Sequence, residues 1–152
     1  MSLNVELLKS SFLQIKAQET ECMTHFYTLL FVDYPEVKPL FAKTHMEKQA
    51  KQLFKSLVLV IDNLRHPDVL AKALQGLGTR HIHYGVLPAH YPMVGSTLLK
   101  AFSLCLGNAW TPAIEKAWSE AYTVVTALML SGTDYTAEIL TPQAQQVYAQ
   151  QV

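Results

Sequence analysis

The chain has 152 residues, half of them apolar and 16% charged, and its twelve basic and twelve acidic side chains give a formal net charge of zero. This length predicts one domain with a single sizeable core. Zero net charge, without a block of like charge, argues against a nucleic acid or an anionic membrane surface as partner. Because typical soluble domains carry about 25% charged residues, the apolar surplus indicates an internal apolar pocket or a surface for self-association.

The cysteines and the N-terminal segment bear on where the protein works. Cys22 and Cys105 show no metal-ligand spacing, and we interpret them as two reduced, buried thiols of a cytoplasmic protein. The N-terminal segment carries Glu6 and Lys9 and lacks a cleavage site, so it does not resemble a signal peptide. The longest unbroken apolar run, 57–61, is far shorter than the roughly 18 residues of a membrane span.

Apolar residues recur at three- and four-residue steps along almost the whole chain, and this pattern is typical of amphipathic helices. Gly85 and Gly107 are placed to end two of them, and Thr111 is placed to cap the last. The sequence predicts an all-α domain over 1–131 and a polar, Gln-rich tail over 132–152 that is either a frayed helix or disordered. The expected helices cover about 3–15, 19–32, 36–41, 45–64, 67–83, 88–106 and 111–129.

The stretch 77–95 holds three of the six histidines and passes from one helix through a corner with Gly85 and Pro88 into the next. A histidine at a helix end, just before a corner, can direct a ring nitrogen at a bound metal, so His81 is the candidate ligand. The residues alone support a surface histidine near a helix end at least as well.

Four other polar residues stand in apolar surroundings, and each has two interpretations. Tyr27 is either a core tyrosine or a hydrogen-bond donor to a small ligand, and Gln49, one turn before Leu53, is either a boundary residue or a second donor. Tyr91 is either a packed ring or a neighbour of His81. Glu120 is either solvated or, if buried, in need of a partner such as a histidine N–H.

Several motifs in order resemble bacterial globins, and more closely the haem domain of flavohaemoglobins and the single-domain globins related to them. They are HFY at 25–27, YPEV at 34–37 leading to LF at 40–41, QAKQLF at 49–54, RHxxxGV at 80–86, HYPMVGSTLL at 90–99 and AWSEAY at 117–122. The resemblance covers about two-thirds of the chain. It implies a globin fold over 1–131, a three-on-three helical sandwich around haem b, an iron protoporphyrin IX.

The resemblance also implies a role for each matched residue. His81 matches the proximal iron ligand, and Tyr91 and Glu120 match the tyrosine and glutamate that hydrogen-bond around it. Tyr27 and Gln49 match the distal tyrosine and glutamine that contact bound ligand. The remaining expected positions are Leu53 over the iron, Phe41 stacked on the porphyrin, Val94 in contact with it, Pro35 opening the short third helix, and Lys43, Arg80 and His83 at the propionates.

The function implied is reversible binding of dioxygen, nitric oxide or carbon monoxide, with nitric oxide detoxification as the chemistry and an external reductase as the electron source. We expect a monomer or weak homodimer, with no nucleic-acid or membrane partner. Two alternatives stay open: a tight oxygen-binding or gas-sensing globin without significant turnover, and a cofactor-free helical interaction domain that uses its apolar surplus to dimerise.

Overall fold

The structure is a computed structural model that describes residues 3–131, and the tail predicted over 132–152 lies outside these residues. Six α-helices and two short 3-10 helices make up the described part, and no strand occurs in it, as predicted. The elements are α1 (Val5–Lys16), α2 (Glu19–Asp33), η1 (Pro35–Phe41), α3 (Met46–Asp62), α4 (Pro67–His83), α5 (His90–Leu106), η2 (Gly107–Ala109) and α6 (Pro112–Ser131).

The helices begin and end where the local sequence favours it. Gly85, just past α4, has a φ of 86°, and Gly107 ends α5 with a φ of 54°, a region of backbone conformation that favours glycine. The Thr111 hydroxyl accepts from the Ile114 amide at 3.2 Å and caps α6. The helix expected from residue 88 begins two residues later, at His90.

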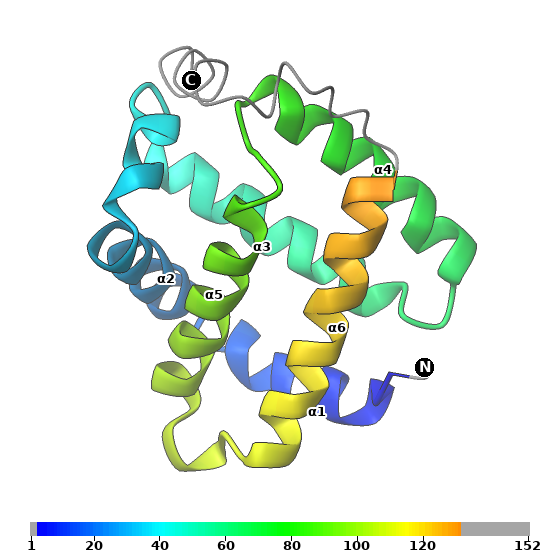
Figure 1. Ribbon diagram of the computed structural model, residues 1–152. Coiled ribbons are helices and arrows are strands. Elements are labelled where there is room, and N and C mark those ends of the chain that lie inside the picture. The colour runs from blue at the N-terminus through cyan, green and yellow to red at the C-terminus, as the bar shows by residue number, and fades with distance from the viewer. Residues whose placement is uncertain (1–2, 132–152) are drawn as a thin grey trace.

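Two helix pairs form the frame of the molecule. α2 packs along α5, and α4 packs along α6, while α5 also contacts α6 and joins the two pairs. Figure 1 shows α1 crossing below α5 and α6, and α3 passing behind them from the α2 side toward the α4 side. This arrangement of helices in two crossed layers confirms the predicted all-α fold.

The apolar interior divides into two clusters. The larger one contains Phe26, Tyr27, Phe54, Phe102 and Trp118, and it gathers side chains from α1, α2, α3, α5 and α6. The smaller one gathers side chains from α3, α4, α5 and α6 and consists of Val60, Leu70, Leu74, Tyr91 and Met129. The candidate distal and proximal residues therefore belong to different parts of the core.

A disulfide joins Cys22 of α2 to Cys105 of α5, with the two Cα atoms 5.8 Å apart. The expectation of two separate reduced thiols is therefore wrong. The two cysteines are 83 residues apart in sequence, and only the packing of α2 along α5 brings them together. Because disulfides are rare in cytosolic proteins, the cysteines no longer support the cytoplasmic expectation, which stays a prediction.

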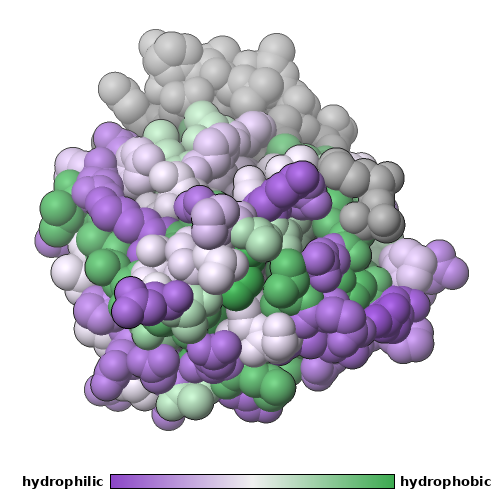
Figure 2. All heavy atoms as spheres, turned by 90° about the horizontal axis from the view of Figure 1, so that it is seen from below, coloured by the Kyte–Doolittle hydropathy of each residue, from purple (hydrophilic) through white to green (hydrophobic). Residues whose placement is uncertain are grey.

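The surface is mixed in character. Figure 2 views the molecule from below and shows hydrophilic side chains surrounding smaller apolar areas. The exposed large apolar side chains come from different elements: Leu13, Val32, Leu59, Val69, Tyr84 and Leu104. Among residues 3–131, none of the helices has the length and apolar character needed to cross a bilayer.

Candidate functional site

His81 sits in the last turn of α4, and its ring has a defined orientation. The Nδ1 atom lies 2.8 Å from the carbonyl oxygen of Leu77, one turn earlier. A carbonyl can only accept a hydrogen bond, so Nδ1 carries the proton and Nε2 keeps its lone pair. This is the tautomer that a metal-binding histidine needs, with the second ring nitrogen bonded to the protein.

The surroundings of His81 favour the neutral ring. Burial lowers the pKa of His81 below its usual value, the Leu77 carbonyl opposes this effect, and the positive charge of neighbouring Arg80 adds to it. A neutral imidazole is the form that donates its lone pair to a metal. The helix end therefore supplies both the orientation and the protonation state of a ligand.

Two tyrosine rings lie near the His81 ring. The Tyr84 ring lies on the exposed side at 5.6 Å between centroids, and the Tyr91 ring lies at 6.5 Å. Tyr91 is only 4% exposed and belongs to the first turn of α5. The predicted proximity of Tyr91 to His81 is therefore present in the structure.

Tyr122 of α6 positions this part of α5, a role that the sequence reasoning missed. Its hydroxyl donates to the Tyr91 carbonyl at 2.7 Å. Its ring lies so close to Gly95 that a Cβ at that position would be 2.4 Å from the ring. Burial raises the pKa of Tyr122, so the hydroxyl keeps its proton and remains a donor. The glycine of HYPMVG and the tyrosine of AWSEAY were visible signals, but their pairing was not.

A second glycine fixes α4 against α6. A Cβ on Gly78 would lie 1.9 Å from the carbonyl oxygen of Met129 and 2.7 Å from its carbonyl carbon. Because these are backbone atoms, they cannot turn aside as a side chain can. Gly78 stands three residues before His81. The close approach at Gly78 therefore fixes the position of the histidine relative to α6.

Tyr27 lies among aromatic rings on α2 and η1. Its centroid is 4.8 Å from that of Phe26, 6.1 Å from Phe31 and 5.8 Å from Phe41. Burial raises the pKa of Tyr27 to about 12, and a hydrogen bond with the Gln49 side chain partly opposes this. The structure thus brings the two predicted distal residues together and keeps Tyr27 a neutral phenol that can donate.

The other predicted cofactor-binding residues fall into two groups, one partly buried and one exposed. Phe41, Leu53 and Val94 are partly buried and pack against the larger core cluster. Lys43, Arg80 and His83 are all exposed, which suits groups expected at ionised propionates. His45 is also exposed, and its side chain caps α3 by accepting from the Lys48 amide.

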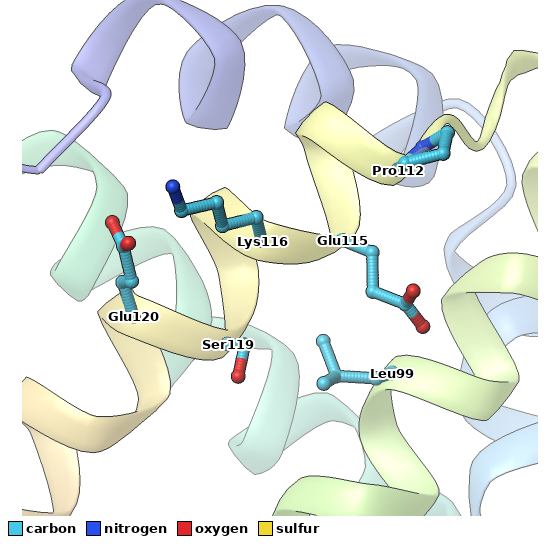
Figure 3. A pocket seen from close by; sticks show the side chains of 6 residues that line it. All are labelled: Leu99, Pro112, Glu115, Lys116, Ser119 and Glu120. Carbon is cyan, nitrogen blue, oxygen red and sulfur yellow. The ribbon is translucent and has the colours of Figure 1, made fainter.

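Glu120 is not brought to His81. It is half-buried on α6, two residues before Tyr122, and residues two apart point to nearly opposite sides of a helix. Figure 3 shows Glu120 and Lys116 extending from the same side of α6. Glu120 lines a surface hollow of about 530 Å³ together with Leu99, Pro112, Glu115, Lys116 and Ser119. A second hollow that it lines contains Glu6 and Arg65.

The side chains described above, apart from Glu120, indicate which kind of metal site the chain can form. α2 and α3 supply a buried phenol and amide, and α4, α5 and α6 supply an oriented neutral histidine with supporting tyrosines. Among the described residues there is no group of three or more histidine, cysteine, aspartate or glutamate side chains that could hold a bare metal ion. A single histidine ligand fits a metal whose other bonds come from a cofactor, as in haem proteins.

Comparison with known proteins shows the family directly. The globin family model matches residues 24–129, and the chain belongs to the globin family. This range contains every residue assigned to the site above. Membership in this family implies that the chain binds haem.

Among curated relatives, the chain is similar to flavohemoproteins. It is 32% identical over 124 residues to the Bacillus subtilis flavohemoprotein, covering 80% of this chain and 31% of that protein. It is 38% identical over 109 residues to the Rhodopirellula baltica flavohemoprotein, covering 70% and 27%. The chain thus spans about three-tenths of the length of the curated relatives it matches.

Two solved structures resemble the chain over most of their length. A bacterial globin from Campylobacter jejuni has a TM-score of 0.70 and 29% identity, covering 84% of this chain and 91% of that one. An engineered carbene transferase from Rhodothermus marinus, described as a candidate nitric oxide dioxygenase, has a TM-score of 0.75 and 27% identity, covering 95% and 93%.

Proposed function

We propose that this globin holds haem b through His81 Nε2, binds dioxygen and consumes nitric oxide with the help of an external electron donor. The observation that carries the proposal is the hydrogen bond from His81 Nδ1–H to the Leu77 carbonyl, which leaves Nε2 available as a metal ligand. Haem iron supplies the centre at which nitric oxide, dioxygen and one electron yield nitrate.

On the distal side, Tyr27 and Gln49 bind and orient the gas. The raised pKa of Tyr27 keeps its phenol protonated at neutral pH, so the hydroxyl donates to a polarised diatomic ligand. The Gln49 amide is a second donor beside it. Leu53 and Phe41, both partly buried, are the apolar residues that exclude water from the bound gas.

On the proximal side, Tyr91 and Tyr122 hold the His81 ring in place. Exposed Lys43, Arg80 and His83 are the residues we assign to the haem propionates, because ammonium and guanidinium groups pair with carboxylates and the histidine carries ring nitrogens that can donate. The similarity to flavohemoproteins and to a described candidate nitric oxide dioxygenase supports the detoxification chemistry.

Optical spectra of the purified protein test the haem site. We expect a strong Soret band that shifts on reduction and again on exposure to air, and His81→Ala to lose or displace it. His25→Ala replaces an exposed histidine of α2 and should leave the spectra unchanged. A colourless protein that refuses added haemin would overturn the proposal.

Nitric oxide consumption with a supplied reductase tests the chemistry. We expect steady consumption of nitric oxide in air-saturated buffer and formation of nitrate in equal amount. A protein that binds oxygen normally but consumes no nitric oxide under these conditions would be an oxygen binder without turnover.

A further inference from the structure

Charge is distributed very unevenly along a chain whose net charge is zero. The segment 38–55, which covers most of η1 and the first half of α3, contains five of the twelve basic residues and one of the twelve acidic residues. The remaining chain therefore carries seven basic and eleven acidic side chains. The basic residues of this segment are Lys38, Lys43, Lys48, Lys51 and Lys55.

All five lysines are exposed. Lys48, Lys51 and Lys55 follow one another at three- and four-residue steps, so they share one face of α3 over about 10 Å of helix. Within residues 3–131 the ion pairs are Arg65 with Glu6 and Lys100 with Asp33, and neither involves this segment. Lys48, Lys51 and Lys55 form what we call the basic face.

The basic face lies on the outside of the helix that carries the distal residues. Gln49 and Leu53 are partly buried on the inner side of α3, while the lysines point to water. A helix with its side chains is about 10–12 Å across. A partner on the basic face is therefore separated from the proposed ligand-binding residues by little more than one helix.

We propose that the basic face docks an acidic, electron-donating flavoprotein that reduces the haem held by His81. This inference rests on the proposed function, which needs one electron for each nitric oxide converted. In each transfer the anionic flavin hydroquinone loses one electron and becomes the neutral semiquinone, and ferric haem gains that electron and becomes ferrous. No proton moves, and no bond forms or breaks.

The chemistry of the basic face favours a protein partner over a membrane or a nucleic acid. The apolar face of α3 is packed in the core, through Phe54, Val60 and Ile61, so it is not available to enter a bilayer. The basic face contains lysine only, and not the arginines that read bases bidentately. Lysine point charges accelerate encounter and leave complexes short-lived, which suits the small, weak interfaces of electron transfer.

The decisive experiment measures binding to a bacterial flavodoxin, an acidic flavoprotein, in its oxidised form. The test variant replaces Lys48, Lys51 and Lys55 by Glu. The matched control replaces Lys9, Lys16 and Lys116 by Glu, which changes the net charge equally at three other exposed sites. At low ionic strength we expect the test variant to raise the Kd about tenfold or more and the control to change it by less than about twofold. Wild-type binding should weaken steeply with salt.

A second measurement follows reduction of the ferric protein under anaerobic conditions. Flavodoxin hydroquinone should reduce the test variant about tenfold more slowly than the control at low salt. Photoreduced riboflavin, an uncharged donor, should reduce wild type and both variants at equal rates, and this shows that their haem sites are equivalent.

Three results would overturn the docking proposal. One is equal flavodoxin affinity in both triple variants, and another is binding that does not depend on salt. The third is flavodoxin binding that is unchanged in the test variant while binding to phosphatidylserine vesicles or duplex DNA is lost. If binding and reduction follow the expected pattern but nitric oxide is not consumed, the docking surface is supported and only the dioxygenase chemistry fails.

Discussion

The distal and proximal halves of the proposed haem site are held in place in different ways. Tyr27 lies in the larger core cluster, among the rings of Phe26, Phe31 and Phe41. His81 and Tyr91 depend instead on backbone contacts: the Leu77 carbonyl on the histidine ring and the Tyr122 hydroxyl on the Tyr91 carbonyl. The proximal helices α4 and α5 also approach α6 closely, at Gly78 and at Gly95. Distal geometry thus follows from side-chain packing, and proximal geometry follows from how closely helices approach.

The largest effect is expected where α4 meets α6. Gly78→Ala places a Cβ 1.9 Å from the Met129 carbonyl oxygen, so the two helices must separate. We expect a loss of about 3 kcal/mol in the free energy of unfolding, which corresponds to a fall in Tm of roughly 6–12 °C.

Gly76→Ala is the matched control for this change, one half-turn earlier on α4. Its Cβ would meet only the Arg80 side chain, at 3.7 Å, and alanine favours a helix by about 1 kcal/mol over glycine. Its Tm should therefore stay level or rise. Equal losses in the two variants would show that close approach of α4 and α6 is not what matters.

On the distal side the expected effect is kinetic. Tyr27→Phe keeps the ring among its aromatic neighbours but removes the hydroxyl donor, so oxygen should dissociate about tenfold faster or more. This follows from the roughly 1.5–3 kcal/mol of a hydrogen bond to a charged group. Flash photolysis or stopped-flow displacement measures the rate. An unchanged rate would mean that Tyr27 does not contact the ligand.

Tyr122→Phe tests the proximal side with a smaller change. The ring over Gly95 remains, but the bond to the Tyr91 carbonyl is lost, at a cost of about 1 kcal/mol in stability. Because Tyr91 borders the His81 ring, the iron–histidine band in the resonance Raman spectrum should shift. Tyr34→Phe, at the C-terminal end of α2, should leave this band in place. A band that stays fixed in Tyr122→Phe would limit Tyr122 to a role in stability.

The smallest effect concerns pH and the corner between α4 and α5. Burial lowers the pKa of His90, with Glu36 opposing, and His90 Nδ1 accepts from the Leu87 amide at 3.0 Å. The folded state therefore binds protons less readily than the unfolded state. The contribution of His90 to stability is complete above its usual pKa of about 6.5 and declines as pH falls below that value.

Urea midpoints at pH 7.5 and 5.5 measure this contribution. His90→Asn keeps an acceptor for the Leu87 amide but removes the titrating ring, so the midpoint should fall less between the two pH values than in the wild type. His66→Asn, which replaces an exposed histidine, should keep the wild-type difference. If His90→Asn retains the full decline, the pH dependence arises elsewhere.

Local sequence patterns were enough to predict most of the helices and several residues of the candidate site. Helical periodicity predicted the six α-helices and η1 but not the short helix η2, and Gly85, Gly107 and Thr111 marked ends that the structure confirms. The histidine just before a corner and the order of short motifs pointed to His81, Tyr27 and Gln49. These features were accessible because each depends on residues within a few turns of one another, or on family motifs that keep their order.

Only the tertiary structure decided which distant residues meet. It joined Cys22 to Cys105, placed Tyr122 against Tyr91, and left Glu120 beside surface hollows instead of at His81. The physical reason is that helix crossing distances and rotations arise from packing along whole faces, and a linear pattern does not contain them.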